Sequence, residues 1–151
     1  MQYRFKEIRE DNDLKQHEIA SKIKMGRAEY ANIESEISNI KLKDFLKFCN
    51  EFNCTMDYAT NLTSNNKTHL LTPIHKIDKS VMSERLRIIE VENSLEGKDV
   101  AVELGITPSA YSNYKNKNME RLMQTLMVKH LAEKYNYSMD WIVGRSNKKT
   151  R

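Results

Sequence analysis

One stretch of the sequence, residues 4–34, reads RFKEIREDNDLKQHEIASKIKMGRAEYANIE, and residues 85–115 read RLRIIEVENSLEGKDVAVELGITPSAYSNYK. Aligned at an offset of 81, they share seven identities: Arg4/Arg85, Ile8/Ile89, Asn12/Asn93, Leu14/Leu95, Ala20/Ala101, Tyr30/Tyr111 and Asn32/Asn113. Apolar exchanges such as Ile23/Leu104 keep the same helical spacing in both copies. Further along, FNCTMDY (52–58) aligns with YNYSMDW (135–141) after a shift of two residues. The sequence therefore predicts a duplicated unit of about 60 residues.

The composition favours an all-α fold. The 151 residues include only 4 Gly and 2 Pro, whereas 39% are hydrophobic and 30% are charged. Such a chain can bury a core but has few of the breakers that β-sandwiches and long loops need. Apolar periodicity predicts five short helices in each unit. They lie near 2–11, 16–23, 27–35, 42–52 and 56–61, and near 82–92, 97–104, 108–116, 122–135 and 139–143.

Several predicted helices begin at a recognisable start signal. Thr107 is an N-cap residue followed by Pro108 at the first helical position, and Thr55 and Ser138 are expected to cap the last helix of each unit.

The turn after the second helix of each unit differs between the copies. Gly105 supplies the positive φ that a tight helix-to-helix turn needs, whereas the first unit has Lys24 there. The turn at Lys24 in the first unit is therefore expected to be either strained or differently shaped from the turn at Gly105.

These patterns divide the chain into four parts: a unit over 1–62, a linker over 63–80, a unit over 81–146 and a basic, disordered tail over 147–151. The start of the linker is rich in Asn, Ser and Thr, which is typical of a flexible segment. Its continuation, LLTPIHKIDKSV (70–81), has apolar residues at helical spacing with a cap at Thr72–Pro73. This pattern predicts either an extra helix or an early start of the second unit.

Several classes of protein are not indicated. No apolar run approaches 18 residues and the N-terminus has no apolar signal core, which favours a cytoplasmic protein. Cys49 and Cys54 stand on apolar-patterned positions and are expected in the core. The four His residues have no metal or catalytic spacing, and no phosphate loop, nucleophile elbow or paired-carboxylate site is present. We therefore expect no catalysis, no metal and no cofactor.

The net charge of +4 is unevenly distributed. Residues 1–62 hold 10 Lys/Arg against 11 Asp/Glu, and residues 81–151 hold 12 against 9. The basic character that a polyanion partner requires therefore lies in the second half.

The first unit resembles the phage-repressor type of helix-turn-helix domain (XRE-type), the family of the lambdoid repressors and Cro. The resemblance is carried by LKQHEIASKIKMGRAEYANIESEISNIKLKDFLKFCNEFNCTMDYATN. GKDVAVELGITPSAYSNYKNKN and YNYSMDWIVGR resemble the same superfamily, so the resemblance implies two tandem five-helix, lambda-repressor-like domains. It also implies an ion pair between the first and third helices, at Arg9 and Glu34. The second copy has Glu90 and Lys115, which keep the pair with reversed signs.

The third helix of each unit is the expected recognition helix, and the helix before it presents its N-terminus to phosphates. In the first unit this selects Gln16, Arg27, Ala28 and Asn32, with Arg27 suited to guanine and Asn32 or Gln16 to adenine or a phosphate. Glu29 is either an acceptor for cytosine or a solvated charge that weakens binding.

The second unit has a different set of candidate DNA contacts. Its recognition helix has no acid, and Gly97 replaces the family's glutamine, which leaves the adjacent lysine to act on phosphate. The absence of arginine from that helix favours either weak or shape-led discrimination between bases. The candidate residues are Lys98, Ser109, Ser112, Asn113 and Lys117.

Aromatic and apolar residues of the recognition helices and the last helix are expected to pack inward rather than stack on bases. They are Tyr30, Ile33, Tyr111, Tyr114 and Trp141.

The sequence thus predicts a sequence-specific DNA-binding transcription regulator, a repressor of phage or mobile-element type that binds double-stranded DNA. A homodimer is expected, because the acidic first unit looks the poorer DNA reader and is available to pair two chains. The alternative is an antitoxin or inhibitor-like module in which one unit binds a protein partner.

Overall fold

The computed structural model describes residues 2–151, which form ten α-helices, one short 3-10 helix and no β-strand. The first half contains α1 (Phe5–Asp11), α2 (Gln16–Lys22), α3 (Arg27–Glu34), α4 (Leu42–Glu51) and α5 (Met56–Ala59). After η1 (Thr68–Leu70), the second half contains α6 (Lys79–Glu92), α7 (Gly97–Leu104), α8 (Pro108–Lys115), α9 (Thr125–Tyr135) and α10 (Met139–Ile142). The expectation of an all-α fold is confirmed.

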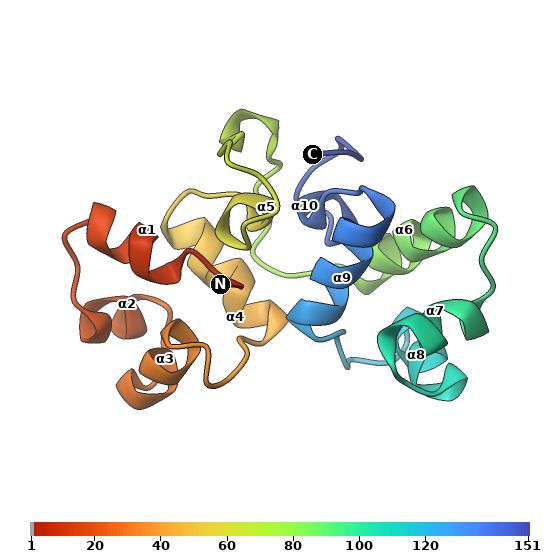
Figure 1. The fold of residues 1–151 in the computed structure, drawn as a ribbon, viewed down its shortest axis with the longest axis horizontal. Coiled ribbons are helices and arrows are strands. Elements are labelled where there is room, and N and C mark those ends of the chain that lie inside the picture. The colour runs from red at the N-terminus through yellow and green to blue at the C-terminus, as the bar shows by residue number, and fades with distance from the viewer. Residues whose placement is uncertain (1) are drawn as a thin grey trace.

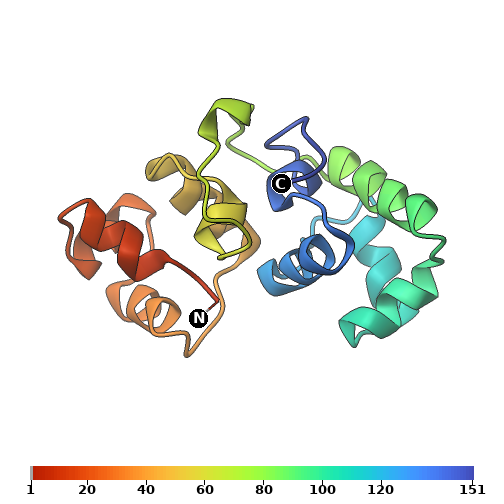
Figure 2. The ribbon, with the colours of Figure 1, turned by 45° about the horizontal axis from the view of Figure 1, so that its top comes forward.

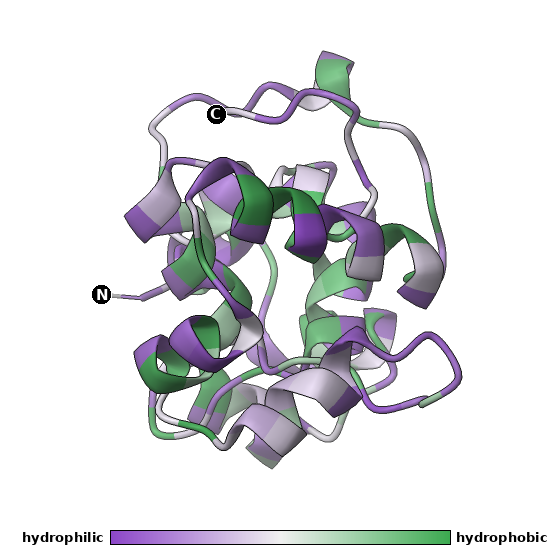
Figure 3. Cartoon of the chain, turned by 90° about the vertical axis from the view of Figure 1, so that its right-hand side faces the viewer, coloured by the Kyte–Doolittle hydropathy of each residue, from purple (hydrophilic) through white to green (hydrophobic). Residues whose placement is uncertain are grey.

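The two halves have the same helix order and lie side by side. Figures 1 and 2 show α4, α5, α9 and α10 in the middle, with α1–α3 on one flank and α6–α8 on the other. Figure 3, which views the molecule from one side, shows hydrophobic and hydrophilic residues alternating along individual helices, as expected of amphipathic helices.

Equivalent residues of the two halves make equivalent contacts. The Arg4 guanidinium lies 4.7 Å from the centre of the Tyr58 ring, and the Arg85 guanidinium lies 5.2 Å from that of Trp141. Each arginine also donates to the backbone carbonyl of the aromatic residue that it covers. The repeat found in the sequence is therefore accompanied by a repeat in packing.

The predicted start signals are confirmed. The Thr55 hydroxyl accepts from the backbone N–H of Tyr58, and the Ser138 hydroxyl accepts from that of Trp141. Thr107 caps α8 and is followed by Pro108 at its first position. These caps fix where three of the helices begin.

Buried apolar residues of both halves form one continuous cluster. The aromatic and apolar residues expected to pack inward are all buried, as are the two free thiols: Tyr30, Ile33, Tyr111, Tyr114, Trp141, Cys49 and Cys54.

The turn after the second helix has the same left-handed conformation in both halves. The φ angle is 67° at Gly105 and 56° at Lys24. Of the two alternatives, the first half thus has the strained turn rather than a differently shaped one.

Of the two alternatives for the segment between the halves, the extra helix is absent from residues 71–78, and the second half instead starts early, at Lys79. Leu71 forms an antiparallel bridge with Ser146, and the N–H of Thr72 donates to the carbonyl of Arg145 (2.7 Å). A residue before proline avoids the α conformation, which explains why no helix runs through Thr72. The helix begins only at Lys79, inside the expected linker, where the Asp78 side chain caps it.

The C-terminal tail is ordered, so the expectation of a disordered tail is wrong. The carbonyl of Lys149 accepts from the N–H of Ser138 (2.8 Å), and the Arg151 guanidinium donates to the carbonyls of Ala132 and Tyr137 (2.8 Å each). The charge of Arg151 is therefore held against the second half.

Candidate nucleic-acid interface

The first candidate surface is the outer face of α3. This helix packs against α2 and buries Tyr30 and Ile33. The opposite face exposes Arg27, Ala28 and Asn32. Three of the four residues predicted to contact DNA in this half thus lie together on the solvent side of one helix.

The fourth residue, Gln16, begins α2 and is half-buried. Its amide donates to Glu34 (3.3 Å), and the same carboxylate receives two hydrogen bonds from Arg9 at 2.9 Å. Burial alone would raise the pKa of Glu34, but the hydrogen bonds from Arg9 and Gln16 lower it. The ion pair expected between α1 and α3 is therefore present, and it also orients Gln16.

The second candidate surface is the outer face of α8. This helix buries Tyr111 and Tyr114 and exposes Ser109, Ser112 and Asn113. No acid occurs within Pro108–Lys115, so the exposed face offers neutral hydrogen-bonding groups throughout.

The reversed ion pair of the second half is also present. The Lys115 ammonium lies 3.0 Å from Glu90, and the Tyr111 hydroxyl donates to the same carboxylate at 3.3 Å. Lys115 also lies over the Tyr111 ring, 4.8 Å from its centre. Both halves thus join their first and third helices through one charged contact, which makes Lys115 part of the scaffold.

Two lysines, Lys98 and Lys117, were among the predicted DNA contacts. Both Lys98 and Lys117 are exposed. Lys98 lies 3.1 Å from Glu96, and this hydrogen bond raises its pKa. Lys98 must give up that partner to bind a phosphate. A side chain at Gly97 would begin 3.5 Å from the Lys115 ammonium, so the position of the family's glutamine adjoins the scaffold lysine.

The two acids near α3 have different roles. Glu29 is exposed in the first turn of the helix. The Glu36 carboxylate instead accepts from the backbone N–H groups of Gln2 (2.6 Å) and Tyr3 (3.2 Å). Glu29 is therefore the acid that bears directly on what α3 binds.

The halves meet through a reciprocal contact that the sequence did not predict. The Asp57 carboxylate accepts from the N–H of Met139 (2.7 Å) and the hydroxyl of Ser138 (2.5 Å). The Asp140 carboxylate accepts from the N–H of Met56 (2.9 Å). Each short helix, α5 and α10, thus places an aspartate on the N-terminus of the other. The signal was the shared Met-Asp in FNCTMDY and YNYSMDW.

Asp140 has a buried cation beside it. Arg145 is 3% exposed and lies 2.7 Å from Asp140. It also donates to the carbonyl of Cys54 (3.0 Å) and the side chain of Asn50 (3.1 Å) in the first half. Arg145 therefore ties the segment after α10 to α4 and to the turn between α4 and α5.

Asp57 has no salt-bridge partner within the described part of the chain. Its burial and the neighbouring charge of Asp140 raise its pKa to about 7, opposed by Ser138, Met139 and Arg151. The two aspartates thus make equivalent hydrogen bonds to backbone N–H groups, but only Asp140 has a cation paired with it.

Further contacts extend the boundary between the halves. The Thr125 hydroxyl at the start of α9 donates to the carbonyl of Ile40 (2.6 Å) and is buried. The Asn50 amide donates to the carbonyl of Ile74 in the connecting segment (2.8 Å). The connection is therefore part of the packed interface.

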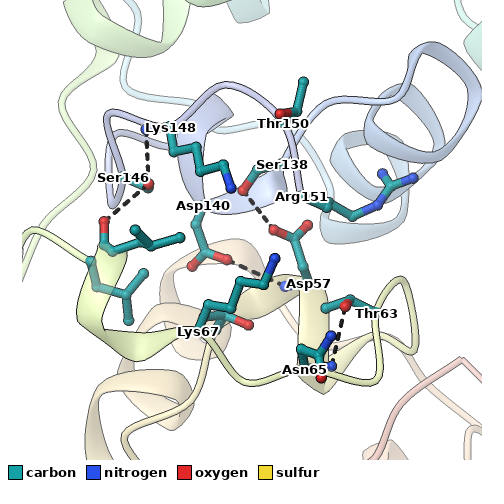
Figure 4. A pocket seen from close by; sticks show the side chains of 13 residues that line it. Asp57, Thr63, Asn65, Lys67, Ser138, Asp140, Ser146, Lys148, Thr150 and Arg151 are labelled. Atoms are coloured by element: carbon teal, nitrogen blue, oxygen red, sulfur yellow. Dashed lines mark hydrogen bonds between the residues drawn. The ribbon is translucent and has the colours of Figure 1, made fainter.

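The cavity at the reciprocal contact is small. Figure 4 shows Asp57 and Asp140 within it, with Lys67, Lys148 and Arg151 nearby. Its volume is about 30 Å³, which is room for one water molecule and not for a small-molecule effector.

Two exposed lysines at the start of α4 were not among the predicted contacts. Lys41 and Lys43 line a groove of about 480 Å³ that is also bordered by Glu120, Leu122, Met123 and Gln124, in the segment between α8 and α9. The signal was the repeated lysine in NIKLKD, at a helix start where orphan N–H groups also favour anions.

Two further features are absent from residues 2–151. No helix there is long and apolar enough to cross a membrane, and no group of three His, Cys, Asp or Glu side chains is placed to hold a metal ion.

Comparison with known proteins finds a family match within the first half. No curated protein and no solved structure matches the chain. A family model described as helix-turn-helix matches residues 5–58, which run from the start of α1 into α5. Residues 5–58 are therefore similar to helix-turn-helix domains.

Proposed function

We propose that this chain is a sequence-specific DNA-binding transcription regulator, a repressor of phage or mobile-element type, that reads DNA with α3 and α8. The observation that carries the proposal is the helix-turn-helix match of residues 5–58 together with the exposed polar face of α3. The second half is proposed as a further helix-turn-helix domain because its five helices, caps and charged contact repeat those of the first.

The two recognition faces read DNA by different chemistry. Arg27 donates a bidentate pair to guanine O6 and N7, and Asn32 pairs with adenine. On α8, Asn113 is the corresponding base reader, while Ser109 and Ser112 hydrogen-bond to either bases or phosphates. Gln16, Lys98 and Lys117 hold phosphates, and repression follows where the bound site overlaps a promoter.

A selection experiment tests this proposal. The full chain is mixed with a random pool of duplex DNA, and the bound fraction is sequenced. Enrichment of a defined sequence supports the proposal, and an unenriched pool contradicts it.

Two substitutions then test the recognition faces. We expect Arg27→Ala and Asn113→Ala each to weaken specific binding by about 1–3 kcal/mol, because each removes a bidentate base contact. Gel shifts with the selected duplex measure the loss. Arg87→Ala and Asn65→Ala are matched controls, since both residues are exposed and lie outside α3 and α8. Equal affinity for all four variants would remove Arg27 and Asn113 from the site.

A second candidate function is binding of a protein partner by the first half, as in antitoxins or inhibitors. It is favoured by the excess of acids in residues 1–62 and by the exposed Glu29 on α3. Glu29→Gln separates the two functions. Tighter DNA binding by this variant supports α3 as a DNA reader, because an exposed acid repels phosphates.

A further inference from the structure

We infer that one copy of this chain binds one DNA site made of two unlike half-sites, with no second copy required. This inference rests on the proposed function and concerns the form of the DNA that is bound. It departs from the homodimer that the sequence favours.

The first step is the symmetry of the contact between the halves. Asp57 binds the N–H of Met139, and Asp140 binds that of Met56, so each bond repeats the other with the halves exchanged. Reciprocal contacts of this kind characterise the interface of a twofold dimer. Here both partners belong to one chain, which therefore has the architecture of a dimer.

The second step is that the contact is a packed interface. Met56 and Met139 are fully buried at it, and the Met139 sulfur lies 3.4 Å from the Thr60 hydroxyl of the other half. Thr125 and Arg145 are buried where they hydrogen-bond to the first half. These contacts hold the halves in one arrangement, whereas a free linker would let each half rotate independently.

The third step is the placement of the recognition helices. In Figure 1, α3 and α8 lie at the same, lower edge of the molecule, on opposite sides of α4 and α9. Helix-turn-helix dimers place their two recognition helices in successive major grooves on one face of the duplex. A single chain of this protein presents both helices toward one face in the same manner.

The fourth step is the difference between the two recognition faces. The first six residues of α3 read RAEYAN and those of α8 read PSAYSN. Arg27 and Glu29 have no charged counterparts on α8, so the two helices require different base sequences. The preferred DNA is therefore an asymmetric pair of half-sites, called here the α3 half-site and the α8 half-site.

The fifth step concerns a second copy. Homodimerisation through α5 or α10 would require the reciprocal contact to open, because Asp57 and Asp140 are already bound within the chain. The surface of α5 and α10 that could pair two chains is thus already buried between the two halves of one chain.

The test rearranges the DNA and leaves the protein unchanged. The probes are the duplex selected from the random pool, a duplex with two α3 half-sites, one with two α8 half-sites, and the selected duplex with half a helical turn, about 5 base pairs, inserted at its centre. Footprinting of Arg27→Ala and Asn113→Ala assigns the half-sites. Affinity is measured by fluorescence anisotropy, and stoichiometry by native mass spectrometry.

We expect one chain per selected duplex and at least about tenfold weaker binding to each symmetrised duplex, since replacing a half-site introduces several mismatches. The insertion should reduce affinity to that of a single half-site, because it turns the second half-site to the opposite face. Two chains on a symmetrised duplex that binds best, or full tolerance of the insertion, would overturn the inference while leaving DNA binding intact. Failure to bind any duplex would overturn the proposed function instead.

Discussion

At the residue scale, Lys24 is one of the non-glycine residues whose backbone departs from local preference. Its φ of 56° repeats that of Gly105, although a side chain makes this conformation unfavourable. The fold thus imposes the same turn on both halves irrespective of the residue. Lys24 is exposed, so nothing in its packing requires a lysine.

We predict that Lys24→Gly stabilises the protein by about 1 kcal/mol, because glycine adopts a positive φ without strain. Gly105→Ala should destabilise it by a similar amount through φ alone, since a Cβ there meets nothing within 4 Å. Urea unfolding measures both changes. Lys22→Gly, at the last residue of α2, is the control and should lose stability, because glycine disfavours the helix and the ion pair between Lys22 and Glu51 is lost. A loss in Lys24→Gly as large as in Lys22→Gly would mean that the turn is unstrained.

The raised pKa of Asp57 predicts how the stability of the protein depends on pH. Its pKa is about 7 in the folded protein, against an ordinary value of 3.8. Between these values the folded state holds more protons than the unfolded state, so the free energy of unfolding should fall as pH rises from about 4 to 7.

The variant Asp57→Asn isolates this effect, because its side chain stays neutral at every pH. We expect the free energy of unfolding of this variant to change less between about pH 4 and 7 than that of the wild type. The difference should be on the order of a few kcal/mol at most. Denaturation at a series of pH values provides the measurement. Parallel curves for the two proteins would show that Asp57 does not titrate there.

At the scale of elements, both halves fasten their first helix to their third by an ion pair of opposite polarity. Arg9 pairs with Glu34 at 2.9 Å, and Lys115 pairs with Glu90 at 3.0 Å. The contact between helices is retained while the charges are exchanged. The geometry therefore matters more than which helix supplies the cation.

A double-mutant cycle tests this equivalence. Glu90→Arg alone should destabilise the protein by placing two cations together, and adding Lys115→Glu should restore part of the loss. We expect a coupling of about 0.5–3 kcal/mol from thermal or urea unfolding of the four proteins. Additive effects would mean that the two side chains do not interact in solution.

The helices were largely predictable because their signals are local. Thr55, Thr107 and Ser138 cap helices where the sequence placed them, and apolar spacing identified the buried faces. Residues 70–77 were not predictable, because their apolar residues pack against a segment distant in sequence, which periodicity does not reveal. Leu71 accordingly joins Ser146 in a bridge instead of a helix.

The candidate contacts were predictable to a similar extent. The outward positions on α3 and α8 follow from helical periodicity, and their residues are exposed. The pairing of Lys98 with Glu96 and the tie between Gln16 and Glu34 depend on side-chain geometry, which the sequence pattern does not specify. Whether these residues bind DNA stays a prediction.

At the scale of the whole molecule, the repeated Met-Asp forms the contact between the two halves. The repeat was visible in the sequence, but its consequence arises only when α5 and α10 meet and each aspartate reaches the other helix. The linker, the C-terminal tail and Arg145 then reinforce that contact. Together these interactions fix α3 and α8, the two proposed recognition helices, relative to each other.

The most direct measurement is the distance between spin labels on the two recognition helices of the full chain without DNA. Ala28→Cys and Ser109→Cys place labels at equivalent exposed positions, and the native Cys49 and Cys54 are buried. We predict a single narrow distance distribution from pulsed electron spin resonance. A broad distribution extending to about 60 Å, as for halves joined by a free linker of roughly 20 residues, would contradict the account.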